Sequence, residues 1–287
     1  MPVDRYRITG PETTFPLSTL APPPPPSSSS SSSSSLAGSS TAVSRPDGRP
    51  AAQLRPIYMS TGTVSHANGS AYLELAGTRV MAAVYGPREN TRAGGLQQFN
   101  EQAVLQCDVA RAPFASPRDD ARIGTDANTS AAAADRQFAT SVATALQSSV
   151  RLEKYAKSSI DLFVTIIGDD GGALAASINC CTLALADAGI EMNDMVTAAS
   201  VALAANTNIV LWDPTHLEES RASAIATQAL RVSDNLVTLL DQSGESSLKL
   251  SVKALEACSS MSVQLHGLMQ QTLVSSLLER RKQQLLP

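Results

Sequence analysis

The sequence is poor in aromatic residues, which make up 4% of its 287 residues, although 43% of the residues are hydrophobic. The core is therefore expected to be built from alanine, leucine and valine. Cysteine is also scarce. The four cysteines show no metal-type spacing, and the adjacent Cys180 and Cys181 lie in an apolar stretch where thiols pack as small hydrophobes. This usage predicts a reduced, intracellular protein without a disulfide framework.

Long apolar runs are missing as well. No run approaches the roughly 18 residues that a membrane span needs, and the first five residues, from Met1 to Arg5, lack the apolar core of a signal peptide. The sequence therefore predicts a soluble protein with no membrane partner.

Positive charge is not in excess: 22 Lys and Arg stand against 26 Asp and Glu, which gives a net charge of −4. A domain that grips nucleic acid alone usually carries a basic field, because it must neutralise phosphates. Any contact with RNA is therefore expected to be local or shared with basic neighbours.

Residues 1–44 do not resemble folded structure. Pro22 to Pro26 are followed directly by Ser27 to Ser35, a tract that is extended at its prolines, flexible at its serines and unable to bury apolar surface. Either a regulatory docking tail or an inserted disordered segment explains this composition, and the second needs fewer assumptions. Residues 45–287 are left to form one domain.

Within that domain, strand-like segments precede a helix, and the order then repeats. This alternation predicts an α+β domain with two related halves, at about 45–150 and 151–287. Leu236 to Leu240 and Leu248 to Leu250 suggest a late hairpin, and Gly189 is expected to cap a buried helix. The predicted strands are 72–75, 79–85, 104–109, 160–167, 195–203 and 209–212, and the predicted helices are one near 137–146, 173–188 and one beginning near 252, whose apolar stripe is Val252, Leu255, Cys258, Met261, Leu265 and Leu268.

Several short segments follow one another in a characteristic order along the chain. They are the charged turn 45–49, residues 54–57, the glycine turns at Gly69 and Gly77, residues 85–89, residues 111–114, and 183–190. Together they resemble the RNase PH family over about residues 45–278. The resemblance implies the RNase PH fold, which is similar to domain two of ribosomal protein S-five. Asp47 and its flanking arginines, Arg45 and Arg49, are expected to tie the N-terminal arm to the sheet.

Active members of this family degrade RNA from its 3′ end, with inorganic phosphate attacking the terminal linkage. Two anions must be held together, so the site needs donors, positive charge and an acid. In the family an Asp-Gly-Gly turn supplies the acid, and a Thr/Ser-Arg pair at the following helix N-terminus holds the phosphate. Here Asp170 matches the acid, but Ala173 replaces the hydroxyl and Leu174 replaces the arginine. The resemblance therefore implies a phosphate site that has lost its ligands, and a chain that is not an enzyme.

Other positions bear on RNA and metal. Family members carry an arginine-rich segment before the helix near residue 137, where this chain has an alanine run and Arg136. Arg88 matches an arginine near the family's active cleft, and either RNA or a structural carboxylate such as Glu89 is a possible partner. Adjacent Asp169 and Asp170 could bind a metal, although such pairs are more typical of a solvated turn. We predict no metal and no cofactor. The segment Trp212–Glu219 is interpreted as a strand end at Pro214 followed by an acidic loop.

In eukaryotes six RNase PH-like chains form the ring of the RNA exosome, and this sequence looks most like the mRNA-transport type of ring subunit. The resemblance implies a structural role in 3′-to-5′ RNA processing and degradation of rRNA, mRNA and non-coding RNA. The implied partners are the other RNase PH-like subunits of a heterohexameric ring, RNA-binding cap subunits and RNA in the channel, and the implied location is the nucleus, the nucleolus and the cytoplasm. The alternatives are an active phosphorolytic 3′-to-5′ exoribonuclease and a free-standing RNA-binding module.

Overall fold

The computed structural model describes residues 45–89, 102–115, 127–204 and 209–285. The predicted tail at 1–44 lies outside these residues. The elements, in chain order, are β1 (Ile57–Thr61), β2 (Gly69–Leu75), β3 (Thr78–Glu89), β4 (Val104–Arg111), α1 (Ala127–Gln147), the short 3-10 helix η3 (Leu152–Tyr155), β5 (Ser158–Gly168), α2 (Ala173–Asp187), β6 (Val196–Ala204), β7 (Val210–Trp212), α3 (His216–Arg221), β8 (Ala222–Arg231), β9 (Leu236–Gly244) and α4 (Leu248–Leu285).

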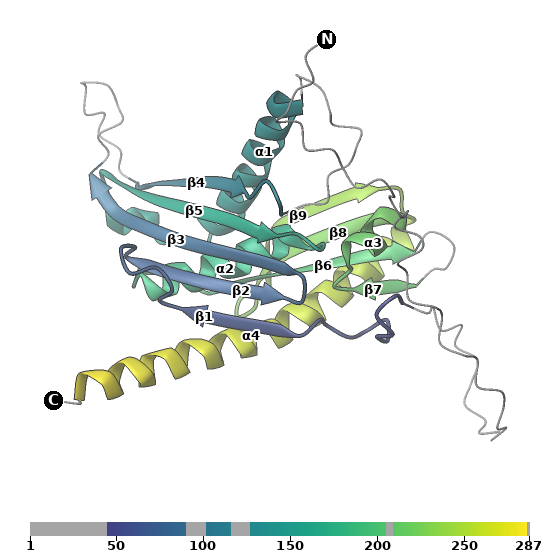
Figure 1. The fold of residues 1–287 in the computed structure, drawn as a ribbon. Helices are drawn as coiled ribbons and strands as arrows, with labels where there is room; N and C mark the ends of the chain where they lie inside the picture. Colours follow the sequence, from purple (N-terminus) through teal and green to yellow (C-terminus); the bar gives the residue numbers. More distant parts are fainter. Residues whose placement is uncertain (1–44, 90–101, 116–126, 205–208, 286–287) are drawn as a thin grey trace, which may run out of the picture. The chain divides into compact units, whose positions relative to one another are not determined.

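The strands form two sheets (Figure 1). The first has the order β1-β2-β3-β5-β4, with β4 parallel to β5 and the other pairs antiparallel. The second has the order β7-β6-β8-β9 and is antiparallel throughout. This mixture confirms the predicted α+β class.

Helix α2 packs against β2 and β3 of the first sheet and against β6 of the second. Twelve of its 15 residues are buried, as expected of a helix between two layers, and its buried polar side chains, Ser177, Asn179 and Thr182, are hydrogen-bonded. The glycine at the start of β2 lets the first sheet approach the end of the helix closely: a Cβ added at Gly69 would lie 2.2 Å from the backbone nitrogen of Ala188. Gly189, with φ +71°, follows the helix as predicted.

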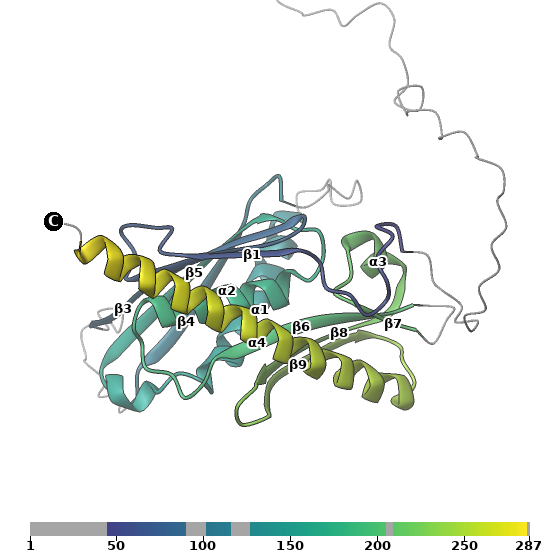
Figure 2. The same ribbon diagram turned by 90° about the horizontal axis from the view of Figure 1, so that it is seen from below.

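Helix α4 crosses the opposite face of the second sheet and reaches β1 of the first, as Figure 2 shows from below. Its buried side chains include Cys258, Met261 and Leu265, three of the six predicted stripe residues. Val252 and Leu268 are instead exposed, at 47% and 38%, because the buried line runs through Ala254 and Met269. Among the helices of the described residues, none is long and apolar enough to span a membrane.

One expectation is corrected, and one strand had no counterpart among the predicted elements. The late hairpin joins β9 to β8, not to residues 248–250, which begin α4. Strand β8 was not predicted because it is rich in alanine and serine, and its strand form depends on pairing with β6 and β9 on either side. Strand β5 completes the first sheet, and α2 packs on that sheet before the second sheet begins at Val196.

One buried arginine connects the N-terminal arm both to the end of β7 and to the turn between β5 and α2. Arg55 donates to Asp213 from Nε at 2.9 Å and from Nη2 at 2.6 Å. The same guanidinium donates to the carbonyl oxygens of Asp170, at 2.8 Å, and Gly171, at 3.0 Å. Burial alone would lower the pKa of Arg55, but the Asp213 carboxylate more than offsets this, and the pKa is raised.

A second buried arginine fixes the start of the domain. Arg45 forms a bidentate pair with Glu218 of α3, at 2.8 Å and 2.7 Å, whereas Asp47 is exposed and pairs with Arg49. The charged turn thus does tie the arm to the domain, but through Arg45 and a helix, not through Asp47 and the sheet.

Replacing Arg55 by Met should destabilise the fold by about 3–5 kcal/mol, because Asp213 would be left buried without its partner. Asp213→Asn should also destabilise it, and the double variant should cost less than the sum of the two. Arg79→Met is the matched control: this arginine pairs with Glu74 on the surface, where the loss should stay within about 1 kcal/mol. Urea unfolding measures all four, and a loss at Arg55 as small as that at Arg79 would contradict the role of the pair.

Candidate functional site

The turn between β5 and α2 leads into the N-terminus of α2, which is where the family resemblance locates the phosphate ligands. Gly171 and Gly172 have φ of +89° and +66°, a region that favours glycine. Space is also tight, since a Cβ added at Gly172 would lie 2.9 Å from Ser200 Oγ and 3.1 Å from Arg55 Nη2. The turn is thus held by the same arginine that binds Asp213.

The first two helical side chains offer nothing to an anion. Ala173 is 8% exposed and belongs to the main core cluster, and Leu174 packs against that cluster. Neither side chain has a hydrogen-bond donor. The helix N-terminus retains its dipole. Its first two side chains, however, pack in or against the core and add no ligand for phosphate.

A carboxylate of the chain itself occupies part of this helix N-terminus. The backbone N–H of Gly172 donates to Glu219 Oε1 at 2.8 Å. Burial raises the pKa of Glu219, and although the Gly172 bond works in the other direction, the neighbouring Asp169 also favours the protonated form. An incoming phosphate would have to displace this carboxylate and approach its negative charge.

Around this point lies a hollow of about 250 Å³. Three carboxylates and one guanidinium line it, and the guanidinium of Arg111 is already bound by Asp169 at 3.0 Å and Asp135 at 3.2 Å. The hollow is therefore acidic, with its single cation engaged. Its lining residues are Arg111, Phe138, Asp169, Gly172, Ala173, Leu174, Glu219, Ile225, Thr227, Asp241 and Ser243.

The acid that faces the hollow is Asp169, not Asp170. The Asp170 carboxylate lies against the β2–β3 turn, where a Cβ added at Gly77 would be 2.7 Å from its Oδ2. Asp169 accepts from Arg111 and, through Oδ1, from the N–H of Gly171 at 3.2 Å. The adjacent aspartates therefore lie on opposite sides of the turn and do not converge on one point. This arrangement favours the turn interpretation over the metal interpretation. Among the described residues, no group of three or more His, Cys, Asp or Glu could hold a metal ion.

The structure does not bring Arg88 or Arg136 to this hollow. Arg88 pairs with Ser159 and Arg111 with Ile166, so they lie at opposite ends of β5, about 23 Å apart at about 3.3 Å per residue. The Arg88 guanidinium lies over the Tyr85 ring, 4.8 Å from its centroid, while the Glu89 side chain is outside the described residues. Arg136 lines a separate groove between α1 and β4. Both side chains are exposed.

Sequence reasoning missed Glu219. Its segment was interpreted as an acidic loop, whereas residues 216–221 form α3. The available signal was the pair of acidic residues after Thr215, since acidic side chains favour the first turn of a helix. That the start of α3 lies beside the start of α2 depends on tertiary contacts, including the bond from His216 N–H to the Asp170 carbonyl oxygen at 3.0 Å.

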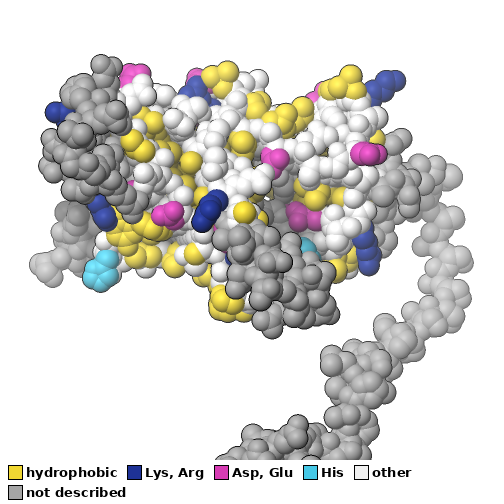
Figure 3. All heavy atoms as spheres, turned by 90° about the horizontal axis from the view of Figure 1, so that it is seen from above, with side chains coloured by type: hydrophobic (Ala, Val, Ile, Leu, Met, Phe, Trp, Pro, Cys, Tyr) yellow, Lys and Arg dark blue, Asp and Glu magenta, His cyan; other side chains and the backbone are white. Residues whose placement is uncertain are grey.

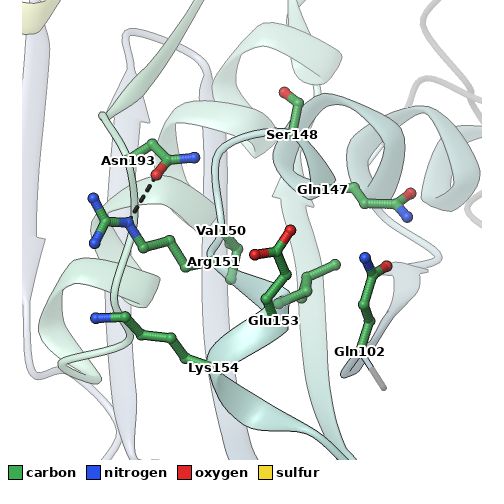
Figure 4. A pocket seen from close by; sticks show the side chains of 9 residues that line it. Gln102, Gln147, Ser148, Val150, Arg151, Glu153, Lys154 and Asn193 are labelled. Atoms are coloured by element: carbon green, nitrogen blue, oxygen red, sulfur yellow. Dashed lines mark hydrogen bonds between the residues drawn. The ribbon is translucent and has the colours of Figure 1, made fainter. Parts of the chain in front are cut away.

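A second hollow, of about 490 Å³, lies between the end of α1, η3 and the segment before β6. Two cations line it, but Arg151 donates to Asn193 at 2.8 Å, as Figure 4 shows, and Lys154 donates to Glu191. Arg151 also lies 3.8 Å from Glu191. With both cations engaged by the chain, this hollow offers no better anion site than the first.

Comparison with known proteins identifies the fold around this site. The family model described as the 3′ exoribonuclease family (RNase PH), domain 1, matches residues 53–191. The chain is 36% identical over 289 residues to the human protein named Exosome complex component MTR3, with 96% of each chain covered. The chain belongs to the RNase PH family.

Further RNase PH relatives agree with this assignment. Exosome complex component RRP41-like of Arabidopsis thaliana is 33% identical, with 81% of this chain and 85% of the relative covered. Two solved structures share the fold. One is rice (Oryza sativa) Rrp46, with TM-score 0.65, 24% identity, and 80% and 100% of the chains covered. The other is an Archaeoglobus fulgidus exosome with RNA bound to the active site, with TM-score 0.63, 22% identity, and 77% and 91% covered. The predicted RNase PH fold and the resemblance to the mRNA-transport type are confirmed.

The raised pKa of Glu219 predicts how pH acts on stability. The folded protein holds the Glu219 proton more tightly than the unfolded chain, so this contribution is full below the usual carboxyl range and is lost as pH rises through the raised pKa. Glu219→Gln mimics the protonated form. It should match the wild type near pH 4 and exceed it at pH 7–8, by less than about 1 kcal/mol.

Thermal unfolding across pH measures this difference. Glu191→Gln is the control, because a hydrogen bond from Lys154 lowers the pKa of Glu191, so its effect should have the opposite sign. If Glu219→Gln were less stable than the wild type by the same amount at pH 8 and at pH 4, the fold would not raise the pKa of Glu219.

Proposed function

We propose that this chain is a non-catalytic, structural subunit of the RNA exosome core ring. It supports 3′-to-5′ processing and degradation of rRNA, mRNA and non-coding RNA by completing the ring and its channel. Its homology to human MTR3 along nearly the whole of both chains supports the ring assignment. The observation that carries the non-catalytic role is the α2 N-terminus, where Ala173 and Leu174 offer no donor and Glu219 accepts the Gly172 N–H.

The charge distribution supports assembly over independent RNA binding. In Figure 3 the Lys and Arg side chains of the visible face stand apart from one another, among hydrophobic and acidic side chains. A chain of net charge −4 without a basic stripe on this face has little to neutralise phosphates by itself. RNA is therefore contacted within the assembled channel, with basic neighbours sharing the work.

The proposed partners are the other RNase PH-like subunits of a heterohexameric ring, together with RNA-binding cap subunits. Arg88 and Arg136 remain the proposed RNA contacts of this chain, because each is exposed and no carboxylate among the described side chains pairs with it. The proposed location is the nucleus and nucleolus, and also the cytoplasm. Microscopy of a fluorescent fusion expressed at native level would test this distribution.

The competing function is phosphorolytic exoribonuclease activity. An active enzyme would need a phosphate site, and the hollow presents three carboxylates with one engaged guanidinium.

Purified chain, alone or with one RNase PH-like partner, should leave a 5′-labelled RNA with a single-stranded 3′ tail at full length. The result should be the same with and without inorganic phosphate, because nothing holds the attacking phosphate. Gel electrophoresis and release of nucleoside diphosphates are the readouts, with an archaeal exosome core as the active control. Phosphate-dependent shortening that Glu219→Gln or Asp169→Asn alters would overturn the non-catalytic role.

The ring assignment has its own test. Tagged chain isolated from its native cells should co-purify with five further RNase PH-like chains and with cap subunits, as identified by mass spectrometry. Isolation as a homohexamer would contradict the assignment.

A further inference from the structure

The first sheet has one face that packs on a helix and one face that does not. Leu73, Val84 and Leu162 point from β2, β3 and β5 toward the core, and among the described helices α2 is the one that packs on these three strands. Because successive side chains of a strand alternate between the two faces of a sheet, the residues between them point the other way. Figure 1 looks onto this second face, with the strands in front of α2. The sheet therefore presents one open face to its surroundings.

The open face is rich in aromatic side chains, although only 4% of the residues of the chain are aromatic. Tyr58 is 60% exposed and Phe163 is 38% exposed, while Tyr72 and Tyr85 are partly exposed. No leucine, isoleucine or valine stands among them on the central strands, where the open face consists of Tyr72, Glu74, Arg79, Met81, Ala83, Tyr85, Asp161, Phe163 and Thr165. The apolar area of this face is thus provided mainly by rings, and not by branched aliphatic side chains.

The four rings form two pairs on neighbouring strands. The ring centroids of Tyr85 and Phe163 lie 5.6 Å apart with planes inclined at 76°, and those of Tyr58 and Tyr72 lie 6.5 Å apart at 60°. Met81 connects the two pairs, since it is the cross-strand partner of Tyr72 and lies on the same strand as Tyr85. The rings thus extend over β1, β2, β3 and β5, which follow one another in the sheet. Three strand spacings of about 4.8 Å make this row about 14 Å wide.

The charges on the open face restrict where an anion could lie. The Arg88 guanidinium is exposed and lies 4.8 Å from the centroid of the Tyr85 ring, at one end of the row of rings. Asp161 is the cross-strand partner of Tyr85, and Asp108 is the partner of Phe163. These two carboxylates repel phosphate from the part of the face next to β4. A bound nucleic acid would therefore place its bases on the rings and a phosphate at Arg88.

We propose that these four residues, Tyr58, Tyr72, Tyr85 and Phe163, form an aromatic platform that stacks the bases of single-stranded RNA. The inference rests on the proposed function and deepens it, because it names the surface through which this chain contacts RNA. Stacking suits such a surface, since every base has a π-face and no base-specific donor is needed. Aromatic side chains on the open face of a sheet stack about two or three bases in RNA-recognition modules. So small a contact agrees with the net charge of −4, because basic neighbours then provide most of the phosphate contacts.

Photo-crosslinking to RNA tests the platform. The full chain is co-expressed and purified with the RNase PH-like subunits encoded in the same genome, and the complex is irradiated with single-stranded RNA that contains thiouridine. Mass spectrometry of the digested complex should locate RNA adducts in β3 and β5, at or next to Tyr85 and Phe163. Duplex RNA of the same sequence should give no adducts there, because its bases are already stacked on one another and cannot reach the rings.

Substitutions separate stacking on rings from simple apolar contact. Tyr85→Leu/Phe163→Leu keeps the apolar area but removes the rings, and it should lower the adduct yield about fivefold or more. Tyr85→Phe/Phe163→Tyr keeps both rings and should match the wild type. Tyr58→Leu, at an exposed side chain of an edge strand, should lower the yield even if the double leucine variant folds poorly. Phe114→Leu changes an aromatic side chain that is 76% exposed outside the sheet, and as the matched control it should have no effect.

Three outcomes would overturn the platform while the ring function stands. The adducts could lie elsewhere on the chain, or the leucine variants could crosslink as well as the wild type does. In the third outcome, Tyr85→Leu/Phe163→Leu folds but no longer joins the RNase PH-like subunits, which would show that a neighbouring protein, and not RNA, covers this face. Failure of the wild-type chain to join any RNase PH-like chain would instead overturn the ring function, and the platform with it.

Discussion

The buried pair between Arg55 and Asp213 joins three segments that are far apart in the sequence. Its two residues are 158 positions apart, and the same guanidinium binds the carbonyl oxygens of Asp170 and Gly171. A planar, permanently charged fork is suited to this task, because it can satisfy a carboxylate and two carbonyl groups at once. The N-terminal arm, the end of β7 and the turn before α2 therefore keep one geometry. The turn is a structural joint of the fold, and under the proposed non-catalytic function it no longer supports phosphorolysis.

At the N-terminus of α2, a carboxylate of the chain lies where the proposed function has lost a phosphate. Glu219 accepts the hydrogen bond that the turn offers at Gly172, so the helix N-terminus is partly satisfied from within the chain. Asp169 and Asp135 engage Arg111 in the same way. The Gly172 N–H and the Arg111 guanidinium, two groups here that could attract a phosphate, are thus each paired with a carboxylate of the protein. This arrangement suits a subunit whose contribution is its shape and its contacts with neighbouring chains.

Much of this could be predicted from local sequence. The alternation of strands and helices, the glycine after α2 and the residues at Ala173 and Leu174 depend on neighbours in the chain, and they were assigned correctly to elements. Other features depend on partners distant in sequence. Strand β8 has too few β-branched residues to be predicted as a strand from its sequence. Glu219 reaches the N-terminus of α2 only because α3 folds back onto it. Asp169, not Asp170, faces the hollow because the turn directs the two side chains to opposite sides. The hairpin error at residues 248–250 has the same origin, since a leucine-rich stretch fits a strand or a helix until the packing of α4 is known.

The central claim is that the N-terminus of α2 does not bind phosphate. Titration of the ¹⁵N-labelled chain with inorganic phosphate tests it most directly, by following the backbone amide signals of residues 172–175 against an equal ionic strength of chloride. The account predicts that these signals move no more with phosphate than with chloride up to tens of millimolar. A saturable shift confined to these amides would contradict it.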